Sequence, residues 1–458
     1  MKWDQRVKTI HFIGIGGISM SSLAAISKKR GYTVTGSDSA ASALTKRLEE
    51  EYGIPVFVPQ RAKNLGEADM VVYTAAIGEE NPELMLAREK GLPCIPRSAY
   101  LGELMKEYPV RLGVSGTHGK SSTTGMLSHI FIEAGMDPTV ACGAELPRIG
   151  GAYRLGGGEH FIYEACEYKD SFLDFHPSIA LWLNIEMDHV DYFKSLDQMS
   201  ASYISSAKDA GAVVVNWDDE NCRAAAEKLQ GVWVIKTGVD RNDVDYHAEN
   251  LKMTGGFASF DLYNESNYLC GIELQVPGIH HVGNALCAAA AALICGISPE
   301  DVAKGLKSFR GICRRFEYKG EREGVRVFDD YAHHPTEVVA TLKAARQMLA
   351  GTQGRLFCVF QPHTYSRTKG FFEEFISALS LADRLILAPI YAAREKNVYG
   401  VSSEDLACRI EGSTSVLNFE EATLILENEV KKGDLVLTMG AGQAYKCGEL
   451  FLKGRIGS

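Results

Sequence analysis

The chain has 458 residues, of which 46% are hydrophobic and 23% are charged, as expected of a globular protein with two or three domains. Its formal net charge of −10 leaves no broad basic face for a polyanion, which excludes nucleic acid as the main partner. No apolar run approaches the roughly 20 residues of a membrane span, and the chain does not start like a signal peptide, so membrane insertion is not expected.

A strand, a glycine turn and a helix open the chain. Residues 7–27 have this pattern, and a second predicted strand ends just before Asp38. Alternating strands and helices predict a parallel sheet covered by helices. Gly14 and Gly16 fit a dinucleotide-binding turn, but Ser19 stands where that motif needs its third glycine. An NAD-binding interpretation is therefore weakened.

The strongest chemical signal is GTHGKSST at 116–123, between a predicted strand at 111–114 and a helix predicted from about Ser121 to Ala134. Its glycines let backbone N–H groups surround phosphate oxygens, Lys120 can reach the outer phosphates, and Ser121 offers a hydroxyl to Mg²⁺. Val114 stands where the full Walker pattern begins with glycine, so a generic P-loop kinase is not favoured. The alternative is a glycine turn with an exposed lysine. We expect Lys120 to be exposed and to play no part in the core.

Two carboxylate-rich segments follow predicted strands and can face this loop. Glu164 comes after a strand at 160–163, and His189 ends the segment NIEMDH at 184–189. Because ligands gather at the carboxyl ends of parallel strands, both are candidate metal ligands beside Ser121. Alternatively, Glu164 caps a helix and His189 is a solvated surface residue.

These motifs resemble the Mur ligases, which build the peptide of bacterial cell-wall precursors, and the likeness covers nearly the whole chain. Several independent matches in the same order make coincidence improbable. The matching segments are GTHGKSST, EACE at 164–167, NIEMDH, GIHHVGNALCAAAAAL at 278–293, FRGICRRFEY at 309–318, VFDDYAHHPTEV at 327–338, FQPHTYSRT at 360–368, PIYAAREK at 389–396 and LTMGAGQAY at 437–445.

The resemblance implies an α/β protein with three domains. A Rossmann-like domain at 1–108 would bind a UDP-sugar, a central P-loop-type ATPase domain with a mostly parallel sheet at 109–312 would bind ATP, and a Rossmann-like domain at 313–458 would bind the amino acid and ATP. The implied reaction joins L-alanine to the carboxylate of UDP-N-acetylmuramate through an acyl phosphate, in peptidoglycan precursor synthesis. The implied cofactors are ATP and Mg²⁺, with Mn²⁺ as a substitute.

The matched positions also imply roles in the reaction. The carboxylate and the γ-phosphate are both anions, so cations must neutralise charge before transfer. Arg367 could pair with the amino-acid carboxylate through two parallel hydrogen bonds. The alternative for His333 and the two residues after it is a helix cap. The implied catalytic residues are Lys120, Glu164, His189, His333 and Arg367, the metal ligands Ser121, Glu164 and His189, and the amino-acid contacts Tyr331, His333 and Arg367.

Nucleotide contacts follow from the same likeness. Asn284 matches an adenine-reading asparagine, whereas His281 stands where an asparagine is common, and Arg315 matches an arginine that reaches ATP. Without the family, Arg315 could equally be part of a solvated basic pair. The implied ATP contacts are Gly116, Thr117, His118, Gly119, Lys120, Ser121, Ser122, Asn284, His281 and Arg315.

The first glycine loop would cradle the diphosphate of the UDP-sugar, with Asp38 near the uridine or its ribose. Ser19 departs from the glycine often found there, but its hydroxyl can also contact phosphate. A plain surface position is the alternative for Arg97. The implied UDP-sugar contacts are Gly14, Ile15, Gly16, Gly17, Ile18, Ser19, Asp38, Thr74, Ala75 and Arg97.

Other interpretations stay open. An NAD-dependent oxidoreductase would leave GTHGKSST unexplained, and a nucleotide-dependent switch would use that loop without a second substrate. Within the family, a recycling ligase that attaches a tripeptide to the same sugar is the nearest competitor. The FQPHTYSRT segment favours the alanine enzyme, although Thr364 replaces an arginine often seen there, so the amino-acid specificity is less secure than the reaction type. The 11 cysteines lack a Cys-x-x-Cys pair, which indicates buried thiols in a reducing cytoplasm and no structural zinc site. We expect a monomer or a weak homodimer.

Overall fold

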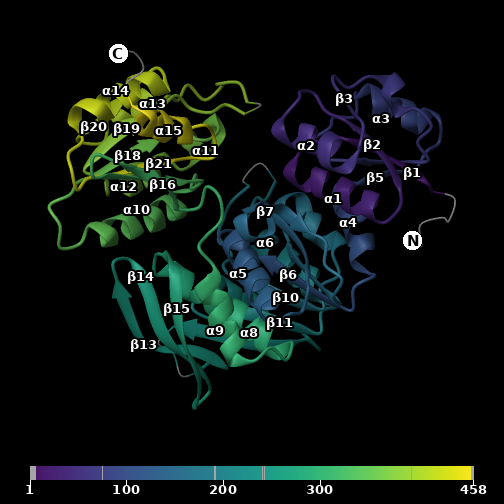
Figure 1. Ribbon diagram of the computed structural model, residues 1–458, viewed down its shortest axis with the longest axis horizontal. Helices are drawn as coiled ribbons and strands as arrows, with labels where there is room; N and C mark the ends of the chain where they lie inside the picture. Colours follow the sequence, from purple (N-terminus) through teal and green to yellow (C-terminus); the bar gives the residue numbers. More distant parts are fainter. Residues whose placement is uncertain are drawn as a thin grey trace. The chain divides into compact units, whose positions relative to one another are not determined.

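The computed structural model describes residues 7–74, 76–189, 192–239, 241, 243–393 and 395–454. The chain divides into two compact units, and Figure 1 labels the helices and strands along the chain. The first comprises Met1–His247, Tyr263–Leu269 and Asn284–Gly305, and the second comprises Ala248–Leu262, Cys270–Gly283 and Leu306–Ser458. Strands and helices alternate along the chain, so the predicted α/β class is confirmed.

The N-terminal sheet has the strand order β3-β2-β1-β4-β5, and its paired strands are parallel. The central strand β1 has four consecutive buried residues, as expected of a parallel strand covered on both faces. The elements are β1 (Thr9–Ile13), α1 (Ile18–Lys29), β2 (Thr33–Ser37), α2 (Ala43–Tyr52), β3 (Val56–Phe57), η1 (Ala62–Leu65), β4 (Met70–Tyr73), α3 (Pro82–Glu89), β5 (Cys94–Pro96) and α4 (Arg97–Met105).

The middle sheet has the order β15-β14-β13-β12-β11-β10-β6-β9-β7-β8. Strand β6 pairs in parallel with β9 on one side and β10 on the other, so the segments after all three strands meet at one edge. The elements are β6 (Val110–Ser115), α5 (Lys120–Glu133), β7 (Thr139–Leu146), η2 (Pro147–Ile149), β8 (Gly151–Arg154), β9 (His160–Glu164), η3 (Tyr168–Asp174), β10 (Ile179–Trp182), α6 (Leu196–Ala207), β11 (Ala212–Asn216), α7 (Glu220–Ala226), β12 (Trp233–Val239), β13 (Tyr246–Thr254), β14 (Phe257–Asn264), β15 (Asn267–Pro277), α8 (His280–Ile294) and α9 (Pro299–Ser308).

The C-terminal sheet has the order β16-β17-β21-β18-β19-β20, with only the β16–β17 pair antiparallel. Alternate residues of β18 point into two apolar cores on opposite faces of the sheet. Cys358 and Phe360 belong to one core, and Phe357 and Val359 belong to the other. The elements are β16 (Glu317–Arg322), β17 (Val325–Asp330), α10 (Pro335–Leu349), β18 (Leu356–Phe360), α11 (Tyr365–Gly370), α12 (Phe372–Leu379), β19 (Arg384–Leu387), α13 (Ser403–Ala407), β20 (Ser413–Ser415), α14 (Phe419–Glu429), β21 (Leu435–Met439) and α15 (Tyr445–Lys453).

Two expectations about the chain as a whole can be compared with the structure. Within the described ranges, no helix has both the length and the apolar character needed to cross a bilayer. The 11 cysteines are all free thiols, but only five of them are buried and Cys408 is exposed, so the expectation of buried thiols holds in part.

Candidate functional site

The sequence at 116–119 forms a glycine turn between β6 and α5. Gly116 has φ +157° and Gly119 has φ +83°, so the turn depends on backbone conformations that favour glycine at Gly119. Helix α5 begins at Lys120, one residue before the prediction. Met126 and Ile130 on this helix are fully buried, which anchors the helix against the sheet.

The segment after β10 holds this turn in shape. The N–H of His118 donates to Asn184 Oδ1 at 2.7 Å, and Asn184 Nδ2 donates to the His118 carbonyl at 3.1 Å. The Thr117 hydroxyl bonds to the backbone of Glu186 in both directions, at 3.0 and 2.9 Å. The same glutamate lies 3.3 Å from His118 Nε2. The NIEMDH segment therefore fixes the turn as well as carrying His189.

Lys120 is not the exposed residue that we expected. Its side chain is only 15% exposed, and Nζ donates to Glu167 Oε2 at 3.0 Å and to the carbonyls of Gly116 and Thr117 at 2.5 and 3.2 Å. Burial would lower the pKa of Lys120, but Glu167, assisted by Cys166, outweighs this and raises it above the ordinary value. The lysine is therefore a charged and largely buried group beside the turn.

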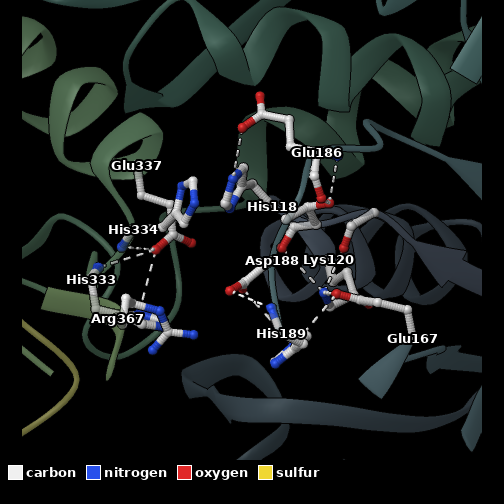
Figure 2. Close-up of polar contacts among 12 residues, drawn as sticks. His118, Lys120, Glu167, Glu186, Asp188, His189, His333, His334, Glu337 and Arg367 are labelled. Carbon is white, nitrogen blue, oxygen red and sulfur yellow. Dashed lines mark hydrogen bonds and ion pairs between the residues drawn. The ribbon is translucent and has the colours of Figure 1, made fainter. Parts of the chain in front are cut away.

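Glu167 connects Lys120 with His189, and Figure 2 shows these three side chains pointing toward one another. The glutamate side chain is 1% exposed, and its Oε1 lies 3.8 Å from His189 Nε2. His189 has φ +50° and its ring lies against Tyr168, with 4.5 Å between centroids. Its N–H donates to Asp188 at 2.7 Å. This histidine is oriented by several neighbours and is not simply solvated.

Glu164 lies at the end of β9, next to the start of α5. Its Oε1 accepts hydrogen bonds from the Cys142 thiol at 3.0 Å and from the N–H of Gly143 at 2.5 Å. The same thiol lies 3.8 Å from the carbonyl of Ser121. Glu164 does not begin a helix, because η3 starts only at Tyr168, so the capping alternative is wrong. The proposed ligands Ser121 and Glu164 thus share a neighbour.

Asn284 lies next to the same turn. A Cβ added at Gly119 would lie 3.0 Å from its Oδ1, and Asn284 is 8% exposed. Ser122, in the first turn of α5, is buried at 7% exposure. The structure thus brings the predicted residues 116–122, Glu164, His189 and Asn284 into one region of the first unit.

The second unit contains a polar cluster centred on Glu337. This carboxylate accepts the backbone N–H groups of His333 and His334, at 3.1 and 3.4 Å, and the Arg315 guanidinium at 3.2 Å. His334 is the N-cap of α10 and Pro335 follows it, so the helix-cap interpretation of this segment is confirmed. Glu337 therefore fixes both the helix start and Arg315.

His333, Tyr331 and Arg367 lie in or beside this cluster. His333 Nδ1 donates to the Tyr331 carbonyl at 3.0 Å, and burial lowers the pKa of His333 to about 4, against the opposing effect of Glu337. The imidazole is therefore neutral at pH 7. Arg367 NH1 lies 3.1 Å from Nδ1 of His363. His281, also in this unit, is 7% exposed, and burial lowers its pKa well below the ordinary value.

The N-terminal glycine loop is held by the end of β2. The N–H groups of Gly14 and Ile15 donate to the Ser37 carbonyl at 2.8 and 3.0 Å, and that of Gly16 donates to Asp38 Oδ2 at 2.8 Å. Gly17 is the N-cap of α1, which begins at Ile18. The loop is thus the N-terminal end of a helix, a place suited to anions.

Arg97 reaches this loop from the start of α4. Its NH1 donates to the Ser19 hydroxyl at 2.9 Å, so it is not a plain surface arginine. Burial lowers the pKa of Arg97, opposed by Cys166 and Asp174. Thr74 is also adjacent, since a Cβ on Gly14 would lie 2.8 Å from its Cγ2. Ala75 lies outside the described residues.

Four residues that organise these sites were not selected from the sequence: Glu167, Asn184, Glu186 and Glu337. The first three lie inside the acidic segments already noted. Glu337 stands at the third position after His334, the spacing of a capping box, which is a signal that could have found it.

Models of one protein family match three consecutive parts of the chain. Residues 9–109 match "Mur ligase family, catalytic domain", residues 114–292 match "Mur ligase middle domain", and residues 314–442 match "Mur ligase, glutamate ligase domain". The three models together account for most of the sequence.

Full-length relatives give the same result. The chain is 44% identical to a UDP-N-acetylmuramate–L-alanine ligase of Acetivibrio thermocellus, covering 98% of this chain and 96% of that protein. It is 43% identical to the protein of that name from Caldanaerobacter subterraneus, covering 98% of both. The crystal structure of UDP-N-acetylmuramate-alanine ligase from Thermotoga maritima superposes with a TM-score of 0.83 at 27% identity, covering 97% of this chain and 98% of that one. The chain therefore belongs to the Mur ligase family, and it has the three-domain α/β fold expected of a member.

Proposed function

We propose that this protein is an ATP-dependent ligase that joins L-alanine to the carboxylate of UDP-N-acetylmuramate, forming ADP and phosphate, in peptidoglycan precursor synthesis. The observation that carries the proposal is identity of 44% over 98% of the chain to a protein with that activity in its name. The charged turn at Lys120 supplies the matching chemistry.

Activation of the sugar carboxylate would require its oxygen to attack the γ-phosphate of ATP, and both groups are anions. The turn at 116–119 and the N-terminus of α5 would bind the phosphates through backbone N–H groups, and Lys120 would neutralise charge as it develops. The bond formed is between carboxylate oxygen and phosphorus, and the bond broken releases ADP. The amino group of L-alanine would then displace phosphate from the acyl phosphate, losing a proton.

The residues near the turn fit Mg²⁺, with Mn²⁺ as a substitute. Both hydrogen bonds that Glu164 accepts from described residues go to Oε1, which leaves Oε2 for a cation. The hydroxyl of Ser121 and the carboxylate of Glu164 are the hard oxygen ligands that Mg²⁺ prefers, and the imidazole of His189 also suits Mn²⁺. A bound cation would supply charge neutralisation between the phosphates and the reacting carboxylate.

We assign the amino acid to Tyr331, His333 and Arg367 in the second unit, where His281 and Arg315 would also contact ATP. A neutral His333 could accept a proton, and the Arg367 guanidinium could bind the α-carboxylate of alanine. The UDP-sugar would bind the loop 14–19 with Asp38, Thr74, Ala75 and Arg97. We retain the division into domains at 1–108, 109–312 and 313–458, which the three family matches support.

We propose that the protein acts in the cytoplasm, where its free cysteines would stay reduced, as a monomer or weak homodimer.

One assay tests the proposal and its nearest competitor together. Phosphate release from ATP is measured with UDP-N-acetylmuramate and, in parallel, L-alanine, glycine, L-serine or a cell-wall tripeptide. L-alanine should give the highest kcat/KM. Faster turnover with the tripeptide would identify a recycling ligase, and ATP hydrolysis that ignores the amino acid would indicate a nucleotide switch.

A further inference from the structure

A network of buried polar groups lies within the N-terminal sheet, and the proposed reaction does not use it. Glu83, in the first turn of α3, and His11, on β1, are both 0% exposed. A buried carboxylate is unfavourable unless donors surround it, and an apolar side chain of similar size often serves a core equally well. The presence of Glu83 in this core therefore calls for a reason beyond packing.

The donors come from several elements around Glu83. Its Oε1 accepts a hydrogen bond from Asn64 Nδ2 at 2.7 Å and one from the N–H of Arg61 at 3.0 Å. Its Oε2 accepts the hydroxyl of Ser37 and lies 3.5 Å from His11 Nε2. Burial would raise the pKa of Glu83, but His11, Ser37 and Asn64 outweigh it and lower the pKa, so the group is charged at neutral pH.

Ser37 links this carboxylate to the glycine loop. It is the last residue of β2 and is 0% exposed. Its carbonyl accepts the N–H groups of Gly14 and Ile15, and the next residue, Asp38, accepts the N–H of Gly16. The Ser37 carbonyl and the Asp38 carboxylate thus bind three consecutive N–H groups of the loop, and the side chain of Ser37 is the point at which Glu83 holds this strand end.

We propose that Glu83 is a positioning residue of the UDP-sugar site. Its carboxylate fixes Ser37, and Ser37 fixes the loop 14–17 so that the N-terminus of α1 stays open to a diphosphate. The inference deepens the proposed function and rests on it for the identity of the ligand. Glu83 itself bonds to neither the loop nor the ligand.

The chain offers a matched pair of variants, because each oxygen of Glu83 has one side-chain amide or hydroxyl donor. Ser37→Ala removes the donor to Oε2 that leads to the loop, and Asn64→Ala removes the donor to Oε1 on the opposite side. Both should lower the thermal unfolding temperature. Binding of UDP-N-acetylmuramate by calorimetry should weaken about tenfold in Ser37→Ala, since a hydrogen bond to a charged group is lost. It should change less than about twofold in Asn64→Ala.

Glu83→Gln keeps the shape of the side chain but removes its charge, and it should weaken UDP-N-acetylmuramate binding at least as much as Ser37→Ala. The KM for ATP should stay within about twofold of wild type in all three variants, because the phosphate loop at 116–119 is a separate structure. Equal losses of sugar-nucleotide binding in Asn64→Ala and Ser37→Ala would reduce Glu83 to a core-stabilising group and overturn the inference.

Hydrogen exchange gives a readout that needs no ligand. Amide exchange in a peptide covering 10–20 should be faster in Ser37→Ala and Glu83→Gln than in wild type and Asn64→Ala, because the carbonyl of residue 37, which accepts the Gly14 and Ile15 N–H groups, is then held less firmly. Unchanged exchange would overturn the inference. If wild type fails to bind UDP-N-acetylmuramate, the proposed function is wrong, and the exchange rates alone then decide whether Glu83 holds the loop.

Discussion

Two glycine turns in the first unit each join a parallel strand to a helix, yet they are held by different means. The turn at 116–119 is fixed by side chains: Asn184 accepts the His118 N–H and donates to the His118 carbonyl, and the Thr117 hydroxyl donates to the Glu186 carbonyl. The turn at 14–17 is fixed mainly by the end of β2, through the Ser37 carbonyl and the Asp38 carboxylate.

The two turns also differ in where positive charge comes from. Lys120 is the first residue of the helix after its turn and is already paired with Glu167. In the N-terminal turn the cation is Arg97, which comes from α4 and bonds to Ser19. A cation next to the turn in sequence suits a phosphate whose charge changes during the reaction. Backbone amides and an arginine from another helix suit a diphosphate that is bound without reacting. The comparison therefore separates a reactive phosphate site from a binding one.

The largest expected effect follows from removing Lys120, the cation of the turn at 116–119. Lys120→Ala should lower turnover by at least about 10²-fold, because the phosphate turn then loses its own neutralising cation. It should also lower the free energy of unfolding by about 3 kcal/mol, because Glu167 is left buried without its partner. Phosphate release and urea denaturation measure the two effects. Adding Glu167→Gln should restore most of the stability and none of the activity; full stability of the single variant would contradict the ion pair.

Two glycine variants sharpen the comparison. Gly119 and Gly14 have φ +83° and +82°, where alanine is strained by about 1–2 kcal/mol. A Cβ added at Gly119 would also lie 3.0 Å from Asn284, and one added at Gly14 would lie 2.8 Å from Thr74. Gly119→Ala should raise the KM for ATP about tenfold and leave the KM for UDP-N-acetylmuramate unchanged. Gly14→Ala should raise the KM for UDP-N-acetylmuramate about tenfold and leave the KM for ATP unchanged. Steady-state kinetics with both substrates would expose any mixing of the two effects.

The sequence predicted the elements that periodicity and turn chemistry determine. The strand predicted at 111–114 lies within β6, and the helix predicted from about Ser121 begins at Lys120. These features depend on local spacing, which one sequence contains. The positions of Glu164 and His189 after predicted strands made both candidates for that turn. The resemblance supported the grouping, because pairing of β6 with β9 and β10 is a long-range property.

The sequence could not show how the charges are partnered. Lys120 was expected to be exposed, but Glu167, 47 positions away, encloses it. Asn184 was read as part of an acidic segment, yet its amide shapes the turn. Partners of this kind depend on which strand ends become neighbours, so no local pattern identifies them. His334 shows the reverse case, since a cap followed by proline is local and was among the stated alternatives.

A smaller effect is expected from Asp38, whose side chain supports the turn at 14–17. Asp38→Ala removes the acceptor of the Gly16 N–H and should raise the KM for UDP-N-acetylmuramate about fivefold, since the loop keeps its bonds to Ser37. Kinetics at saturating ATP measures the change. Ser39→Ala is the control, because Ser39 bonds only to the other oxygen, Oδ1. A similar rise in the control would mean that loss of local order, not the Gly16 bond, is responsible.

The smallest effect should come from changing Arg97, the cation beside the turn at 14–17. Arg97→Lys keeps the charge but loses the fixed geometry with which the guanidinium bonds to Ser19 at 2.9 Å, so the affinity for UDP-N-acetylmuramate should fall about threefold. Calorimetric titration at low and high salt measures it. Because charge is retained, the salt dependence should match wild type, whereas Arg97→Ala should flatten it. If Arg97→Lys lowered turnover as much as Lys120→Ala, this arginine would also neutralise reacting charge. The division between a reactive phosphate turn and a turn that only binds would then fail.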